Sequence, residues 1–255
     1  MNEAEHFERI LEELAGLIGD LGDLATHMVL IGGQVLALES KSAGGDGSIR
    51  MMTPTGIELE RGFSLEPDLL FDVEAAGFQA DRLPEILKER GYQRTRGYRW
   101  GRDIGDYRVE IDLFVPPETE PSFQPTGMTH LAGGSRVAAV SRRLQIELHS
   151  GRVLQVSVPD PVGFMETKVE AMNVRNEAKD AFDLYAYVHQ QSADEIRAAL
   201  DGAGSEGTRL RSRLKAHFGE PSARGIRDVL TYAGSLDQAV KELLTAAIID
   251  LFDEL

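Results

Sequence analysis

The feature that most constrains the fold is a change of sequence pattern at Asp160-Pro161. Before this point, short apolar or alternating runs are separated by turn residues, a pattern that is typical of strands. After it, apolar residues recur at helical spacing, and an aspartate followed by proline is a strong signal for a helix start. The sequence therefore predicts an α/β (α+β) fold in which a mixed α/β domain, residues 1–158, precedes a helical domain, residues 159–255.

The clearest predicted strand covers residues 106–115, where apolar residues alternate with charged ones and Pro116-Pro117 ends the run. Further strands are expected at 28–31 and 68–73, and hairpins at 49–60, with Pro54-Thr55-Gly56 at the turn, and at 143–158. Helices are expected at 2–18, 82–90, 161–173, 175–190, 193–201, 206–217, 222–233 and 236–254.

Composition narrows the function classes. The 255-residue chain has no cysteine, which excludes disulfides, thiolate zinc sites and a thiol nucleophile. Its net charge of −15 argues against binding long nucleic acids over much of the surface, although arginine-rich stretches at 90–102 and 209–215 leave a local basic groove open. The acidic N-terminus and the lack of a membrane-length apolar run predict a cytoplasmic protein with no membrane association.

Gly32-Gly33 interrupts an apolar run at the point where a helical pattern begins. Paired glycines at a strand-to-helix turn let a phosphate approach the backbone N–H groups and the positive end of the helix dipole. The same pair also serves as a tight connection in many α/β proteins, so both interpretations remain open at this point.

Acidic residues cluster at the entrance to the strand at 68–73. Glu66 and Asp68 are two residues apart, so their side chains are expected on the same side of the strand, where a Mg²⁺ ion would relieve their repulsion. A solvated acidic strand entry is the alternative, and Asp72 is a competing partner for Asp68. Asp112, on the charged face of the later strand, would join them if the two strands are neighbours. Three carboxylates predict two Mg²⁺ ions that organise a nucleoside triphosphate, with Asp112 also a candidate base.

Together, Gly32-Gly33, the segment Arg61-x-x-Ser64-x-Glu66-x-Asp68, Asp112 and the stretch 168–184 resemble the nucleotidyltransferase superfamily, specifically the AbiEii/MenT-type nucleotidyltransferase toxins. The resemblance covers roughly residues 25–190. It implies a nucleotidyltransferase-fold mixed sheet with flanking helices, a Mg²⁺ requirement and transfer of a nucleotide from an NTP to an RNA, protein or small-molecule acceptor. It also implies that the chain is the toxin of a toxin–antitoxin pair.

The residue roles follow from this resemblance. Gly32, Gly33 and Gln34 would approach the phosphates, and Glu66, Asp68 and Asp112 would bind metal. Lys168 would neutralise developing charge and, with Arg175, contact the nucleotide.

The spacing of Lys168 and Arg175 places them on one face if the helix is continuous, and Asp180 and Asp183 could hold either cation in place. For Asp183 a structural role is the preferred interpretation.

The chain also departs from the family pattern, and these departures support an alternative function. Glu66-Pro67-Asp68 replaces two aspartates separated by an apolar residue, and Gln34 replaces a Ser or Thr. The alternative is a catalytically degenerate binding or regulatory module that acts through a protein partner, such as an antitoxin. A tRNA acceptor would require the arginines of residues 90–102 to face the site.

Overall fold

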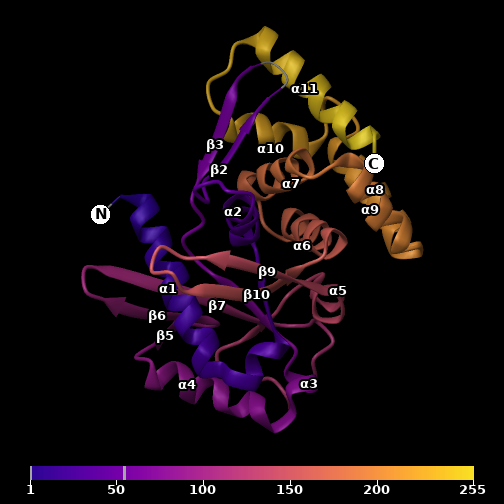
Figure 1. Cartoon of the computed structure of the whole chain (residues 1–255). Coiled ribbons are helices and arrows are strands. Elements are labelled where there is room, and N and C mark those ends of the chain that lie inside the picture. Colours follow the sequence, from indigo (N-terminus) through magenta and orange to yellow (C-terminus); the bar gives the residue numbers. More distant parts are fainter. Residues whose placement is uncertain (1, 54–55) are drawn as a thin grey trace. The chain divides into compact units, whose positions relative to one another are not determined.

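The computed structural model describes residues 2–53 and 56–255 of the chain (Figure 1). The chain folds into two compact units, each made of two separate stretches of sequence. The first, here the sheet unit, contains the chain up to Ser48 and then Phe63–Gly163. The second, here the helical unit, contains Ile49–Gly62 and Phe164–Leu255. The mixed sheet, its flanking helices and the helical C-terminal segment confirm the predicted α+β class.

Within the described residues, the main sheet of the sheet unit has six strands in the order β1-β4-β7-β6-β5, and β8 pairs with β7. The β4–β7 and β7–β8 pairs are parallel, and the other pairs are antiparallel. The β9–β10 hairpin is a separate antiparallel sheet, and β10 lies against β1. The strands are β1 Met28–Ile31, β4 Asp68–Phe71, β5 Gln93–Arg96, β6 Arg99–Ile104, β7 Tyr107–Val115, β8 Thr129–His130, β9 Ser141–Glu147 and β10 Val153–Pro159.

Alternation along β7 places Val109, Ile111 and Leu113 in the core, as the sequence predicts, and leaves the charged residues on the other face. A second apolar cluster joins β1, β4 and α5 through Val29, Leu70 and Val137. The helical segments of this unit are α1 Glu3–Leu21, η1 Gly22–His27, α2 Gly33–Ser42, α3 Val73–Ala76, η2 Gly77–Arg82, α4 Leu83–Glu89 and α5 Gly134–Ala139.

Helix α1 is longer than the sequence predicts. Gly19 does not end it, because a single glycine costs a helix interior only about 1 kcal/mol, and buried apolar residues continue to Leu21. The helix ends at Gly22, which has a φ of 55° and whose N–H donates to the Gly19 carbonyl.

In the helical unit, the hairpin of β2 Ile49–Met52 and β3 Glu58–Gly62 lies against α7 Ala178–Gln190. The sequence predicts this hairpin but places it in the first domain, whereas Ile49, Met51 and Leu59 are buried and β2 packs on α7. Of the predicted turn, Pro54 and Thr55 lie outside the described residues. The other helices are α6 Pro161–Val174, α8 Ala193–Gly202, α9 Ser205–Phe218, α10 Arg224–Tyr232 and α11 Gln238–Asp253.

These helices lie within a few residues of the predicted ranges. In residues 2–53 and 56–255, no helix has both the length and the apolar character needed to cross a membrane.

Candidate functional site

The glycine turn lies beside one of the predicted metal ligands. Strand β1 ends at Ile31, α2 begins at Gly33, and Gly32 between them has a φ of 74°. A Cβ atom at Gly32 would overlap the Oδ2 atom of Asp68, so the carboxylate of Asp68 lies directly against the turn. The turn therefore brings the first backbone N–H groups of α2 to the same place as a carboxylate.

Asp68 and Asp112 are paired in register on the adjacent parallel strands β4 and β7. Register partners point to the same side of a sheet, and neighbouring strands lie about 4.8 Å apart. The Asp112 N–H donates to the carbonyl of Pro67 at 3.0 Å, which fixes this register immediately before Asp68. The two strands are thus neighbours, which is the condition under which Asp112 joins Asp68. Asp72 is not part of this group, because its side chain caps α3 by accepting from Ala75 N–H at 3.0 Å.

Arg99 lies among the predicted metal ligands. It is paired in register with Asp112 across the β6–β7 ladder, and its Nε and Nη2 atoms donate to the two carboxylate oxygens of Asp112 at 2.7 and 2.8 Å. The same Nη2 atom donates to Glu66 Oε2 at 2.8 Å, and Nη1 donates to Glu110 Oε2 at 3.1 Å. Arg99 thus bridges three carboxylates, two of which are predicted metal ligands.

The contact between Arg99 and Asp112 is sheltered from solvent. The Arg99 side chain is 18% exposed and that of Asp112 is 8% exposed, whereas Glu66 is 55% exposed. Hydrogen bonds to Asp112 raise the pKa of Arg99, burial opposes the rise, and the negative charges of Asp112, Glu66 and Glu110 add to it. Arg99 therefore remains a cation throughout the physiological pH range.

Glu110 also pairs with a second arginine at the edge of this cluster. Arg108 donates from Nε to Glu110 Oε1 at 3.2 Å and from Nη1 to Asp103 Oδ1 at 2.7 Å. Gly101 is the register partner of Glu110, and a Cβ atom there would overlap the Arg108 guanidinium. Lack of a side chain at Gly101 therefore leaves room for the Arg108 guanidinium beside Glu110, which lies two residues further along the same strand.

Gln34 is placed differently from the two glycines. Its side chain is fully buried, and Nε2 donates to the carbonyl of Ser64 at 3.1 Å. In this arrangement Gln34 ties the start of α2 to the segment that leads to Glu66 and Asp68, and its side chain positions that segment.

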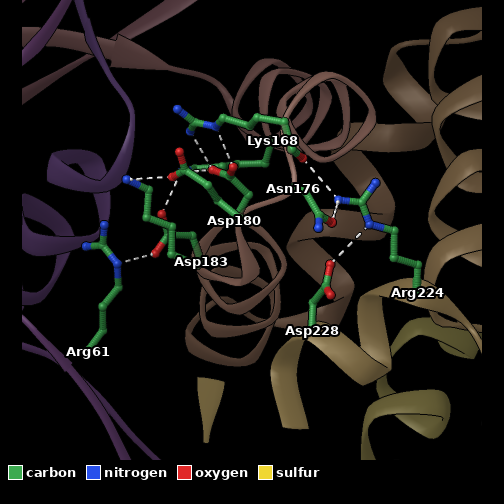
Figure 2. A network of polar contacts seen from close by, with 10 residues as sticks. Arg61, Lys168, Asn176, Asp180, Asp183, Arg224 and Asp228 are labelled. Atoms are coloured by element: carbon green, nitrogen blue, oxygen red, sulfur yellow. Dashed lines mark hydrogen bonds and ion pairs between the residues drawn. The ribbon is translucent and has the colours of Figure 1, made fainter. Parts of the chain in front are cut away.

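The remaining predicted residues belong to the helical unit, where they form a buried ionic network (Figure 2). Lys168 on α6 is 4% exposed, and its Nζ donates to Asp183 Oδ2 at 2.5 Å and to Asp180 Oδ1 at 3.3 Å. Asp183 also pairs with Arg61 of β3, whose Nε lies 2.8 Å from Oδ1. Asp180 and Asp183 therefore hold Lys168 in place, and Arg61 extends the network to the hairpin.

Arg175 reaches this network from a loop. Helix α6 runs without a break from Lys168 to Val174, and Arg175 follows it directly, with an N–H that donates to the Ala171 carbonyl at 2.9 Å. From this position Arg175 makes a two-pronged contact with Asp180, from Nε at 2.6 Å and from Nη2 at 2.7 Å. Burial would raise the pKa of Asp180, but the hydrogen bonds from Arg175 and the charge of Lys168 outweigh it and lower that pKa.

Helix α10 is tied to the same loop. Arg224 donates from Nη2 to the carbonyl of Arg175 and to Asn176 Oδ1, each at 3.0 Å, and pairs with Asp228 through Nε at 3.2 Å (Figure 2). Two arginines thus fix the loop between α6 and α7: Arg175 ties it to Asp180, and Arg224 ties it to α10.

The carboxylate cluster suits a hard divalent cation in its donor chemistry, because Glu66, Asp68 and Asp112 offer only oxygen ligands. Among the described residues, no three or more His, Asp or Glu side chains are grouped so that together they could hold a metal ion. An ionised carboxylate has about four lone-pair sites, so the two hydrogen bonds from Arg99 leave Asp112 able to accept a metal ion. The donor set therefore fits a divalent cation, with Asp68 and Asp112 as the residues that would hold it and Glu66 as the third ligand.

The sequence prediction did not include Arg99. A signal was present in the turn residues Gly97 and Gly105-Asp106, which flank residues 99–104 and delimit a strand. Two other arginines of the 90–102 stretch form ion pairs within the chain, since Arg90 and Arg102 both pair with Glu13.

Comparison with known proteins gives no assignment. No protein-family model matches the chain, and no curated protein matches it with significant similarity.

Proposed function

We propose that this chain is a divalent-cation-dependent nucleotidyltransferase that moves a nucleotide from an NTP to an RNA, protein or small-molecule acceptor. The observation that carries this proposal is the register pairing of Asp68 with Asp112 on parallel strands, with the Asp68 carboxylate against the Gly32 turn. A bound cation would neutralise charge on a triphosphate, and the N–H groups at the start of α2 would orient the phosphates. Two Mg²⁺ ions and a cytoplasmic location remain part of the proposal, as does a toxin role beside an antitoxin.

Lys168 and Arg175 keep different roles within this proposal. The two aspartate contacts of the buried Lys168 favour a positioning role for it in the helical unit. Arg175 has a side chain that is 46% exposed, so it remains the better candidate for a nucleotide contact.

The test is transfer of label from each NTP, with Mg²⁺ or Mn²⁺, to total RNA or to proteins of a lysate. Asp68→Asn and Asp112→Asn should each reduce transfer by at least about 100-fold, because each removes charge from the cluster that would hold the cation. Asp103→Asn is the matched control, since Asp103 pairs with Arg108 and its side chain is 76% exposed. It should leave transfer within about twofold of the unmodified chain.

A second candidate is a catalytically inactive module that acts through a protein partner. It is favoured by the contacts of Arg99 with both oxygens of Asp112. Absence of transfer with all four NTPs, together with absence of metal-dependent NTP binding, would reject the enzyme and favour this module.

A further inference from the structure

We propose that Arg99 is a resident counter-cation that competes with the divalent cation for Glu66 and Asp112, so that metal uptake requires Arg99 to shift toward Glu110. This inference rests on the proposed function, because it takes Glu66, Asp68 and Asp112 as the metal ligands. It goes beyond that function by assigning to Arg99 control over the metal affinity of the cluster.

The guanidinium of Arg99 lies between two of the predicted metal ligands. Its Nη2 atom is 2.8 Å from an oxygen of Asp112 and 2.8 Å from an oxygen of Glu66, so one NH₂ group bridges two predicted ligands. A cation bridging the same two carboxylates would have to lie beside this positively charged group. Lone pairs remain for a metal ion, and the obstacle is therefore charge repulsion and space rather than a lack of donors.

The resident contact between Arg99 and Asp112 is a strong one. The fork of Arg99 matches both oxygens of Asp112, which is the geometry that makes arginine–carboxylate pairs strong. Both side chains are largely buried, and solvent screens such a pair less than an exposed one. Arg99 and Asp112 are also register partners on β6 and β7, so the pairing of the two strands keeps their side chains next to each other.

Glu110 gives Arg99 a second position to which it can move. Its Nη1 atom already contacts Glu110, which lies two residues before Asp112 on the same face of β7. When a metal ion takes Asp112, Arg99 can keep a carboxylate partner by moving along β7 rather than leaving the cluster. Glu110 is thus the partner that would hold Arg99 once the metal ion is bound, and the charge of Arg99 remains compensated in both arrangements.

The experiment measures Mn²⁺ binding to the full chain by electron paramagnetic resonance, without nucleotide. Arg99→Gln should bind Mn²⁺ at least about tenfold more tightly than the unmodified chain, because one nearby positive charge is removed. Asp112→Asn should weaken binding in both backgrounds. The control is Arg152→Gln, which removes the same charge from an arginine of the sheet unit that is 52% exposed and pairs with Glu12, and the Mn²⁺ affinity should change by at most about twofold.

Arg99→Gln also leaves Asp112 without its cation, so its fold is checked by circular dichroism. Arg99→Lys is the second variant: it keeps the charge and loses the two-pronged contact, and its affinity should lie between those of the unmodified chain and Arg99→Gln.

The outcomes separate this inference from the proposed function. Equal or weaker Mn²⁺ binding by Arg99→Gln, with binding still dependent on Asp112, would overturn the competition and leave the metal site standing. Binding that is absent from every variant, or insensitive to Asp68→Asn and Asp112→Asn, would overturn the metal site and the competition together.

Discussion

At Gly32 the backbone has a φ of 74° and a ψ of −158°, a combination that is essentially restricted to glycine. Gly32→Ala should lower the free energy of unfolding by about 1–3 kcal/mol through this backbone strain alone. The added methyl group would also meet the Asp68 carboxylate, so the variant should lose part of any Asp68-dependent Mn²⁺ affinity. Urea denaturation and the Mn²⁺ titration measure the two effects.

Gly19→Ala is the control for the glycine substitution. Gly19 is exposed in the interior of α1, and apart from its chain neighbours and the helix's own backbone no atom of the described residues lies within 4 Å of a Cβ atom placed there. Alanine should therefore stabilise the chain by about 0.5–1 kcal/mol and leave Mn²⁺ binding unchanged. If Gly32→Ala were as stable as the unmodified chain, the turn would not have the conformation described here.

At the scale of elements, the ionic network joins α6, α7 and the β2–β3 hairpin through Lys168, Asp183 and Arg61. Lys168→Met keeps the length of the side chain and removes its charge, leaving Asp180 and Asp183 fully buried with one fewer cation. Removal of one partner from a buried ion pair costs about 3–5 kcal/mol. Urea denaturation should show a loss of stability in this range.

The same substitution at an exposed ion pair provides the comparison. Lys179 lies 2.9 Å from Glu177, and the two side chains are 45% and 48% exposed. Lys179→Met should change stability by at most about 1 kcal/mol, because solvent screens such pairs. Similar losses in Lys168→Met and Lys179→Met would mean that the buried network contributes nothing particular to stability.

The sequence predicts elements more completely than it predicts their partners. Apolar periodicity is a local property, so it located β7 and the helices after Asp160. The contact of Arg99 with Asp112 depends on the β6–β7 register, which turns and packing set together. The β2–β3 hairpin likewise has a local sequence signature, but its packing on α7 is a tertiary contact, which a local pattern does not predict.

For the candidate site, the result is similar. Strand alternation gives the face of each side chain, so the sequence could bring Asp68 and Asp112 together only on the condition that their strands are neighbours, and the β4–β7 pairing meets that condition. The contact of Arg175 with Asp180 could not be read from the seven-residue spacing of Lys168 and Arg175, because it depends on the loop that joins α6 to α7.

At the scale of the whole molecule, stability between pH 7.5 and 5.5 depends on two opposing effects. A net charge of −15 at pH 7 favours expansion through self-repulsion, and protonation relieves it as the pH falls. Against this, His189 and His217 in the helical unit have pKa values below the ordinary 6.5, mainly because burial disfavours their charged forms. For His189 a backbone hydrogen bond with Met52 partly opposes the shift, and for His217 the nearby Arg224 and Arg213 add to it while Asp228 opposes it.

The double variant His189→Gln/His217→Gln separates these effects. Because the folded-state pKa of each histidine is lowered, the unfolded chain binds more protons as the pH falls below about 6.5, and the folded state loses stability there. The unmodified chain should therefore lose stability relative to the double variant between pH 7.5 and 5.5, while their difference stays constant above pH 7.5. Self-repulsion cancels in this difference, because glutamine is neutral and both chains carry the same carboxylates. Urea denaturation at half-unit pH steps measures it, and a difference that is flat across the whole range would show that neither histidine is held neutral by the fold.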